Sequence, residues 1–405
     1  MDSTKNHTSG NPETVSSGTL SLRVPETASP KASETSQLRD SETASAETAF
    51  ITVVMPVRNE ERFIAETLGQ LLRQDYPADR YEIIVADGLS DDRTREIVRD
   101  IREQHFQIKL LDNPKYLSSA GRNVGFKNGK GDYFLVVDGH CFIPDNQLFK
   151  NVAECFEKSA SDCLGRPQPL DPPGLTRFQN VVAMARGSKL GHGGDSLIYG
   201  EFEGYASPVS NGAAYRRDVF EKIGYVDENF DACEDLEFNY RVEKAGLKAY
   251  TSPKLTVRYY PREDLKGLFR QMVRYGRGRF RFIRKHPEAV TLNQLVPAAF
   301  VAGLMLLAVF GLVSLVAMGG AVTESRSFDV TKLMSVPHLF YAVLVLAESV
   351  RLAKNNKWTG LSALPMVFFT IHFGLGYGFV VEALKSVLSS EGKAVTESRS
   401  LGVTE

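Results

Sequence analysis

Residues 295–318 form a run of 24 positions without a charged side chain. In the hydrocarbon core of a bilayer a backbone must satisfy its own hydrogen bonds, so a run of this length predicts a helix that crosses a membrane. Residues 361–381 form a second uncharged run, whereas residues 335–350 are a weaker candidate because that stretch is short and contains Glu348. We therefore predict a transmembrane region over residues 291–390, with three helices preferred over two.

The basic residues around these runs predict an orientation. Ten Lys or Arg residues lie between positions 258 and 285, only two lie in the loop after the first run, and three lie at 351–357. Because cytoplasmic flanks carry the excess of positive charge, the domain before the first run is expected in the cytosol of a multi-pass cell (inner) membrane protein. The alternative, buried core helices of a soluble protein, would require a polar face that these runs lack.

The remaining segments differ sharply in composition. Residues 1–49 are rich in Ser, Thr, Glu and Ala and hold almost no large apolar side chain, so they are expected to form a disordered tail. Residues 50–290 have the composition of a folded domain, and residues 391–405 are expected to be a second, short tail. The 48 basic and 49 acidic residues nearly cancel, which gives the chain no general attraction to nucleic acid.

The domain alternates between short apolar runs and amphipathic segments. Strands are predicted at residues 51–55, 81–86, 108–111 and 133–137, and helices at residues 60–74, 91–104 and 117–127. This order predicts the α/β class, with a parallel sheet and helical crossovers. Pro-rich and Gly-rich stretches between about 165 and 210 are expected to be loops over a site.

Two of the buried strands end on an aspartate, Asp87 and Asp138. In open α/β sheets ligands sit beyond the carboxyl ends of the strands, so both acids are expected near one ligand, such as a cation, a nucleobase or ribose hydroxyls. His140 follows Asp138 on the same side of the strand. Carboxylate and imidazole together can bind Mn²⁺, and a carboxylate with phosphates suits Mg²⁺. A turn or helix cap without a ligand remains an alternative for each aspartate.

A third acidic group, Glu234 and Asp235, opens a predicted helix that runs to about Ala245. Acids in a first helical turn are often only capping residues, so this pair is informative through its surroundings. A turn containing Gly212 precedes it, and a basic segment at residues 270–285 follows it, which together resemble a substrate-bearing turn and a phosphate clamp. Topological charge and attraction to anionic lipid are alternative roles for the basic segment.

An ordered set of motifs over about residues 50–285 resembles the family 2 inverting glycosyltransferases. The branch that looks closest is membrane-associated and extends lipid-linked exopolysaccharide units, including succinoglycan-type glucosyltransferases. The motifs are Met55-Pro56-Val57-Arg58-Asn59-Glu60, Asp87-Gly88-x-Ser90-x-Asp92, Ala120-Gly121-Arg122-Asn123, Asp138-x-His140, Glu234-Asp235 and Gln271-x-x-Arg274-Tyr275-Gly276.

The resemblance implies a GT-A (Rossmann-like) fold, a nucleotide-diphosphate sugar donor and a divalent cation, Mg²⁺ or Mn²⁺. It implies that Asp235 is the catalytic base beside Glu234, that Asp138 and His140 hold the metal, and that Asp87 binds the nucleobase. The other residues that it places at the donor are Pro56, Arg58, Glu60, Arg122, Asn123, Asp138, Gly212, Gln271, Arg274 and Arg277.

The chain departs from the family pattern at two motifs. The metal motif reads Asp-Gly-His where Asp-x-Asp is common, which removes one negative charge from the site. The Gln271 to Tyr275 motif only approximates the Gln-x-x-Arg-Trp of processive synthases, and three spans are few for a polymer channel, so transfer of a single sugar is expected. The expected acceptor is a lipid-linked or other membrane glycan.

Other classes of protein are compatible with parts of the pattern. A membrane sensor that binds a nucleotide sugar without transferring it would retain binding and form no product. A nucleotidyltransferase would share the strand-end acids but has no need of membrane spans. A dehydrogenase or P-loop enzyme is excluded because no G-x-G-x-x-G follows the first strand and Gly129-Lys130 lacks the rest of a phosphate loop.

Overall fold

The computed structural model describes residues 49–192, 197–318 and 324–401, with side chains left out at 192, 314–334 and 389–401. The chain divides into two compact units, Met1–Glu42 and Thr43–Glu405, and every described residue belongs to the second. The predicted tail at 1–49 therefore lies almost entirely outside the described residues.

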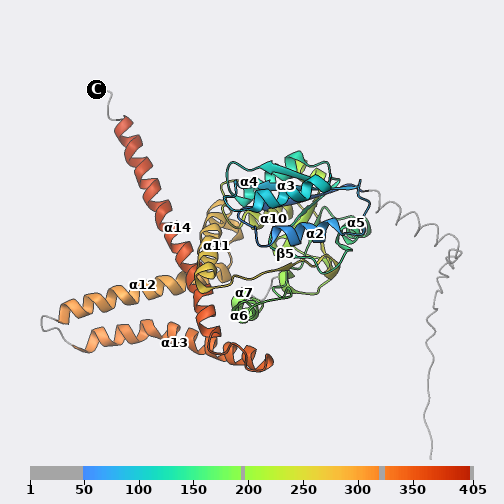
Figure 1. Ribbon diagram of the computed structural model, residues 1–405. Coiled ribbons are helices and arrows are strands. Elements are labelled where there is room, and N and C mark those ends of the chain that lie inside the picture. The colour runs from blue at the N-terminus through green and yellow to red at the C-terminus, as the bar shows by residue number, and fades with distance from the viewer. Residues whose placement is uncertain (1–48, 193–196, 319–323, 402–405) are drawn as a thin grey trace, which may run out of the picture. The chain divides into compact units, whose positions relative to one another are not determined.

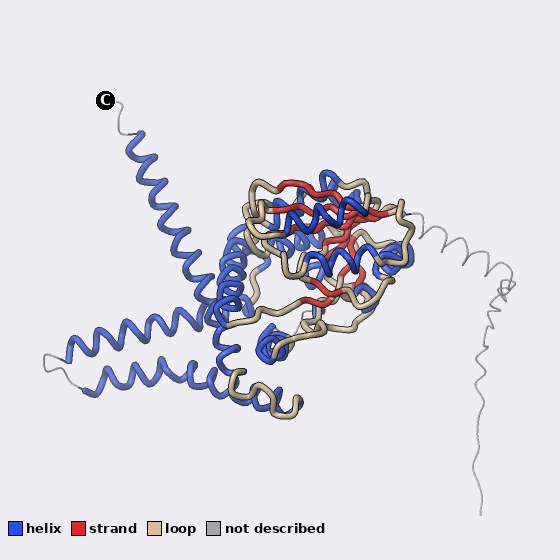
Figure 2. Tube along the Cα trace, viewed as in Figure 1, coloured by secondary structure: helices blue, strands red, loops and turns tan. Residues whose placement is uncertain are grey.

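Eight strands of the described chain form one mixed sheet in the order β3-β2-β1-β4-β8-β6-β9-β7. They are β1 (Ile51–Val57), β2 (Tyr81–Asp87), β3 (Ile108–Asp112), β4 (Tyr133–Val136), β6 (Cys163–Gly165), β7 (Gly204–Tyr205), β8 (Gly212–Arg216) and β9 (Ala249–Thr251). An antiparallel pair outside this sheet joins β5 (Cys141–Phe142) to β10 (Arg258–Tyr259). Figure 2 shows the strands in the middle of the domain with helices packed around them.

The helices of the domain connect and cover these strands (Figure 1). They are α2 (Ile64–Leu72), α3 (Thr94–Gln104), α4 (Ser118–Asn128), α5 (Leu148–Ser159), α6 (Arg177–Arg186), α7 (Lys189–His192), α8 (Pro208–Asn211), α9 (Arg217–Ile223), α10 (Glu234–Lys244) and α11 (Leu265–Lys285). Short 3₁₀ turns are η1 (Leu197–Tyr199), η2 (Pro253–Leu255) and η3 (Pro287–Ala289), and the chain continues into α12 (Leu292–Met318), α13 (Glu324–Asn355) and α14 (Leu364–Leu401).

The first half of the sheet is parallel, as its sequence predicts. β1 pairs in parallel with both β2 and β4, and all seven residues of β2 are buried. Continuous apolar runs form such strands because both faces are covered: Val53 packs into one core cluster and Val54 into the other. The carboxyl ends of β1 and β4 are consequently adjacent, and they open on the side of the sheet where ligands bind in folds of this type.

The second half of the sheet departs from the predicted parallel arrangement. β8 lies between β4 and β6 and runs antiparallel to both. Its aromatic residue Tyr215 is buried in the second core cluster beside Phe126 and Phe238, which ties β8 to α4 and α10. The fold is therefore a GT-A-like mixed α/β sheet rather than a purely parallel one.

The Pro- and Gly-rich stretch that was expected to be loops contains a helix. The Thr176 side chain accepts a hydrogen bond from the backbone N–H of Gln179, and the Gln179 side chain accepts one from Thr176, so α6 begins with a capping box. The helix exists because its apolar face packs against the C-terminal helices: Val182 and Phe368 share one buried cluster. Sequence composition alone hid this long-range partner.

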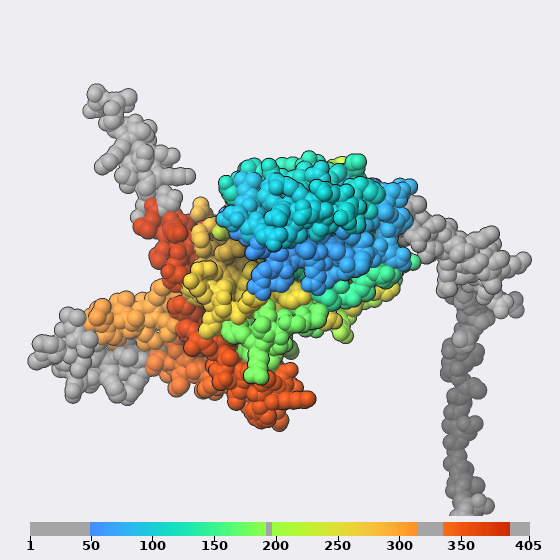
Figure 3. Space-filling view, viewed as in Figure 1, coloured from blue at the N-terminus to red at the C-terminus, as the bar shows by residue number. Residues whose placement is uncertain are grey.

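Helix α11 lies between the α/β domain and the C-terminal helices (Figure 3). Its contact with α14 is exceptionally close, because a Cβ atom added at Gly276 would lie 2.0 Å from the carbonyl oxygen of Leu375. A Cβ atom at Gly378 would lie 2.1 Å from the carbonyl oxygen of Val273. Glycine on both helices therefore permits contact between their backbones.

Three described helices are long and apolar enough to cross a membrane: Leu292–Val313, Ser335–Asn355 and Leu364–Leu388. Helices α12 and α13 run side by side. Helix α14 crosses this pair at the end next to α11 and continues along α11 (Figure 1). Polar contacts also fix α14 to the domain. Glu382 forms ion pairs with Arg277 and Arg281 of α11, and His372 contacts the carbonyl oxygen of Leu190.

Candidate active site

One cavity of about 2120 Å³ reaches from the carboxyl ends of β1 and β4 to the C-terminal helices. Its domain wall combines strand ends, the start of α10 and one side of α11. Its far wall comes from α12, α13 and α14. The predicted site residues that line it are Pro56, Arg58, Glu60, Arg122, Asp138, His140, Glu234, Asp235, Gln271 and Arg274.

Asp138 follows β4 and is held by an aromatic hydroxyl. The hydroxyl group of Tyr259, on β10, donates a hydrogen bond of 2.5 Å to Oδ2 of Asp138. The buried guanidinium of Arg166 in turn donates to the Tyr259 oxygen at 3.2 Å. Burial alone would raise the pKa of Asp138, but the charge of Arg122, with contributions from His140 and Tyr259, outweighs burial and lowers it. The carboxylate is therefore kept ionised inside the cavity.

His140 is oriented by a carboxylate. Its Nδ1 atom lies 2.8 Å from Oε1 of Glu60, whose backbone N–H is bound by the hydroxyl of Thr94. Burial would lower the pKa of His140, but the hydrogen bond and charge of Glu60 outweigh it and raise the pKa. When Nδ1 carries the proton donated to Glu60, the lone pair of Nε2 is available to another ligand.

Arg122, on α4, provides the positive charge between the two acidic groups. Its side chain is only 12% exposed, its Nη2 lies 3.4 Å from Oε1 of Glu234, and its Nε has no hydrogen-bond partner among the described residues. Burial would lower the pKa of Arg122, but the charges of Glu234, Asp235 and Asp138 outweigh it and raise it. Glu234 shows the opposite balance, because burial and the neighbouring Asp235 raise its pKa against the effect of Arg122.

Asp235 stands exposed to the cavity at the first turn of α10, beside the buried Glu234. The preceding residue, Cys233, has a φ of 61°, a left-handed conformation that is uncommon for residues other than glycine. The adjacent α11 supports this bend: a Cβ atom at Gly278 would lie 2.4 Å from the carbonyl oxygen of Ala232. Strained backbone of this kind is retained where the surroundings fix it, often at functional sites.

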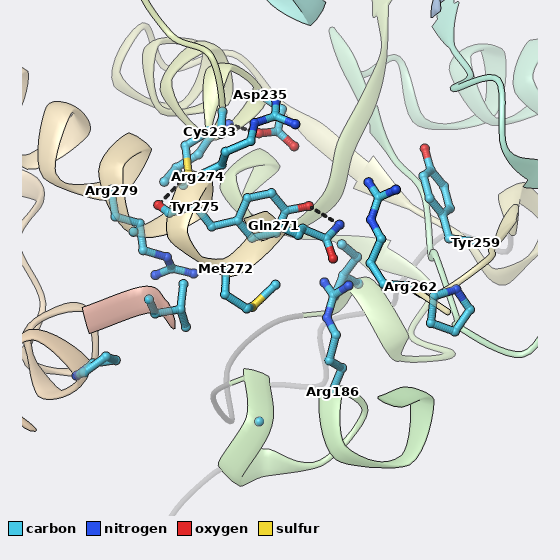
Figure 4. Close-up of a pocket in the computed structure, with 18 of the residues that line it drawn as sticks. Arg186, Cys233, Asp235, Tyr259, Arg262, Gln271, Met272, Arg274, Tyr275 and Arg279 are labelled. Atoms are coloured by element: carbon cyan, nitrogen blue, oxygen red, sulfur yellow. Dashed lines mark hydrogen bonds between the residues drawn. The ribbon is translucent and has the colours of Figure 1, made fainter. Parts of the chain in front are cut away.

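The side of α11 that faces the cavity carries the glutamine motif. The Nε2 atom of Gln271 donates to the Tyr275 hydroxyl at 3.3 Å, while Oε1 of Gln271 is buried without a partner in the described structure. Arg274 donates from Nη2 to the carbonyl oxygen of Asp231 at 2.5 Å, next to the loop that carries Asp235. Figure 4 shows Gln271 and Tyr275 in the middle of the cavity, with Arg262 and Arg186 beside them.

Four predicted site residues do not line the cavity. Asp87 is fully buried and binds Arg95 at 2.6 Å as well as the backbone N–H and hydroxyl of Ser90. Asn123 holds the backbone of Val226. Gly212 packs against the Asn239 side chain, and Arg277 pairs with Glu382 at 2.9 Å, so both have structural partners.

Sequence reasoning also overlooked residues that contact the site. Tyr259 and Arg166 support Asp138, and Arg186 and Arg279 line the cavity. Tyr259 lies on β10, a strand of only two residues, so no alternation in the sequence marks its inward side chain. Nothing local distinguishes Arg186, because α6 itself was expected to be a loop.

The residues at Asp138 are compatible with a divalent cation. No group of three or more His, Cys, Asp or Glu side chains able to hold a metal is found within the described residues. Asp138 and His140 nevertheless supply two donors: one carboxylate oxygen not engaged by Tyr259 and one imidazole nitrogen. Mg²⁺ and Mn²⁺ accept such small protein contributions when phosphates and water complete the ligand set.

The fold and the site define a glycosyltransferase, and comparison with known proteins agrees. The sequence matches "Glycosyl transferase family 2" over residues 52–224 and "Glycosyl transferase family group 2" over residues 176–381. The second match covers half of the chain, so the protein belongs to the family 2 glycosyltransferases.

Individual relatives lie in the same family. The succinoglycan biosynthesis protein ExoA of Rhizobium meliloti is 34% identical over 249 residues, which cover 61% of this chain and 74% of ExoA. A dolichyl N-acetyl-alpha-D-glucosaminyl phosphate 3-beta-D-2,3-diacetamido-2,3-dideoxy-beta-D-glucuronosyltransferase of Methanococcus voltae is 26% identical over 83% of this chain and 98% of its own length.

A solved structure supports the fold. The mannosyltransferase PcManGT of Pyrobaculum calidifontis, determined with GDP-Man and Mn²⁺, superimposes with a TM-score of 0.50 at 18% identity, covering 79% of this chain and 86% of that protein.

Proposed function

We propose that this protein transfers a single sugar, with inversion, from a nucleotide-diphosphate sugar to a hydroxyl group of a lipid-linked saccharide at a cell membrane. The observation that carries the proposal is the continuity of the cavity, which is lined by Asp138, Arg122 and Asp235 of the α/β domain and by apolar side chains of the C-terminal helices. The names of the two relatives, which concern a dolichyl phosphate sugar and succinoglycan, support a lipid-linked acceptor.

In this proposal each part of the site has its own task. Arg122 and Arg58 supply positive charge for the diphosphate of the donor, and Pro56 and Glu60 line its pocket. Asp138 and His140 would hold Mg²⁺ or Mn²⁺, which when bound offsets negative charge on the leaving diphosphate. A role in nucleotide recognition stays a prediction for Asp87 and Asn123. Neither residue lines the cavity, so each would act through the element that carries it, β2 or α4.

Asp235 acts as the base in this proposal. Its carboxylate accepts the proton of the acceptor hydroxyl as that oxygen forms a bond to the anomeric carbon of the donor sugar. The bond between the anomeric carbon and the diphosphate oxygen breaks on the opposite side, and the electron pair leaves with the nucleoside diphosphate. Attack from the opposite side inverts the configuration. Glu234, held near Arg122, positions the turn that presents Asp235.

The proposal is tested with Asp235→Asn in purified membranes that are offered UDP- and GDP-sugars and lipid-linked acceptors. Loss of the base is expected to reduce transfer by about a thousandfold, while nucleotide affinity changes by no more than a few fold. Asp100→Asn on α3, an exposed carboxylate far from the cavity lining, is the matched control and keeps full activity. Near-normal turnover by Asp235→Asn would refute the assignment. Nucleotide-sugar binding without product under any acceptor would favour a sensor.

A further inference from the structure

The cavity has two chemically different ends. The end at β1 and β4 contains the acidic groups and Arg122, which suit the donor. The other end is walled by apolar side chains of the C-terminal helices, and the cavity is also lined by Arg186 of α6 and Arg279 of α11. The apolar wall consists of Val296, Pro297 and Phe300 of α12, Phe340 and Leu344 of α13, and Leu375 and Phe379 of α14.

Arg186 and Arg279 face the cavity without neutralising partners. Neither forms an ion pair with a carboxylate among the described residues, in contrast to Arg277 and Arg281, which both pair with Glu382. Arg186 is largely enclosed, and the hydroxyls of Tyr199 and Tyr275 are its neighbours. A guanidinium group that faces a cavity without a carboxylate partner is suited to binding an anion there, because it offers charge-assisted and bidentate contacts.

Three tyrosine and histidine side chains on this wall already have hydrogen-bond partners. The Tyr341 hydroxyl lies 2.9 Å from Nδ1 of His372, whose Nε2 lies 2.9 Å from the carbonyl oxygen of Leu190. Nε2 of His338 lies 3.3 Å from the carbonyl oxygen of Phe300. This end of the cavity is therefore suited to a hydrocarbon chain rather than to further sugar units, which would need unsatisfied hydrogen-bonding groups.

We infer that Arg186 and Arg279 bind the phosphate groups of the acceptor's lipid carrier, and that the trough between α12, α13 and α14 receives the start of its hydrocarbon chain. The ligand class is thus a long-chain lipid phosphate or diphosphate, with its saccharide directed toward Asp235. This inference rests on the proposed function, and it separates an acceptor phosphate site from the donor phosphate site at Arg122.

The test uses the full-length protein in phosphatidylcholine nanodiscs and a radiolabelled long-chain polyprenyl phosphate as the probe. The double variant Arg186→Gln/Arg279→Gln is expected to weaken probe binding at least about tenfold, because two charge-assisted contacts are lost. The matched uncharged polyprenol should bind the wild type more weakly than the phosphate does. It should bind the wild type and the double variant equally. Affinity for UDP, measured in the same preparations, should stay within about twofold and shows that the double variant is folded.

Lys266→Gln is the control for loss of a basic residue, because Lys266 is exposed on α11 and does not line the cavity. It should bind the probe like the wild type, and Arg186→Lys/Arg279→Lys should recover part of the affinity. Unchanged probe binding in the Gln double variant overturns the inference. Equal competition with the probe by phosphatidylglycerol also overturns the inference, because it indicates a general site for anionic lipid. A selective loss of UDP affinity in the Gln double variant overturns it as well, because it assigns the two arginines to the donor.

These outcomes are distinct from failure of the proposed function. Absence of sugar transfer, together with the expected loss of probe binding, would remove the transferase proposal and leave the lipid phosphate site. Transfer to a lipid diphosphate saccharide with an unchanged KM in the double variant would support the transferase proposal and remove the lipid phosphate site.

Discussion

Tyr259 is a single residue on which the charge of the site depends. Its hydroxyl donates to Asp138 and accepts from Arg166, so it connects a partly buried carboxylate to a buried guanidinium. The Nε and Nη1 atoms of Arg166 have no hydrogen-bond partner in the described structure. Loss of the hydroxyl would therefore leave two charged groups less well satisfied, which is costly in a low-dielectric site.

Tyr259→Phe keeps the ring and removes only the hydroxyl. We expect kcat/KM for sugar transfer to fall about ten- to hundredfold, because a hydrogen bond to a charged group stabilises it by about 1.5–3 kcal/mol. Initial rates at several donor concentrations measure the change. Tyr205→Phe is the control, since Tyr205 is exposed and donates to the backbone of Ser159 away from the cavity. Equal rates for Tyr259→Phe and wild type would contradict this view of the site.

For single residues, local sequence patterns locate the acidic site residues better than the residues that form hydrogen bonds with them. Asp138 and Asp235 could be placed because each follows a recognisable strand or opens a helix. Tyr259 lies 121 positions from Asp138, and the two meet only through the pairing of β10 with β5. A strand of two residues has no periodicity to detect, so that contact could not be predicted.

Among the elements, α11 and α14 determine how the domain is joined to the C-terminal helices. Their backbones touch at Gly276 and Gly378, and side chains on both sides complete a buried cluster that includes Met272 and Ile371. Close-packed interfaces of this kind tolerate added volume poorly.

Gly276→Ala should force the two helices apart, because its Cβ atom would lie 2.0 Å from the carbonyl oxygen of Leu375. We expect a loss of about 2 kcal/mol in stability, together with lower transfer activity, since α11 also supports the loop before Asp235. Gly311→Ala on α12, where a Cβ atom would have no neighbour within 4 Å, should be neutral or slightly stabilising. Thermal unfolding of both purified variants makes the comparison. The same melting temperature for Gly276→Ala and wild type would argue against this packing.

Prediction at the element scale succeeds where the signal is local. The strands that form β1 and β2 and the long apolar helices follow from periodicity and length. The antiparallel insertion of β8 and the existence of α6 depend on partners distant in sequence, such as Phe238 and Phe368, which composition does not reveal.

For the whole molecule, the position of α14 decides the topology. Along residues 372–386 it makes polar contacts with elements of the domain: His372 with Leu190, Glu382 with Arg277 and Arg281, and Ser386 with Arg284. The strongly basic α11 belongs outside the hydrocarbon core, so α14 beside it is expected to lie at the membrane surface. We therefore expect only α12 and α13 to cross the bilayer, which gives two crossings.

A reporter fused after residue 405 tests this arrangement. Two crossings place the reporter on the same side as the α/β domain, so a cytosolic fluorescent reporter should be active and alkaline phosphatase inactive. Three crossings give the opposite pair of results. Three crossings, which the length of the apolar runs and the distribution of basic residues predict, are the alternative that this test distinguishes.

The continuity of the cavity into the C-terminal helices also changes what concentration means for this protein. Under the proposed function the acceptor reaches Asp235 by diffusing within the plane of the bilayer, while the donor arrives from solution. The quantity that governs acceptor encounter is then the number of carrier molecules per unit of membrane area. Diluting the membrane with inert lipid would slow the reaction, although the total amount of acceptor in the vessel stays the same.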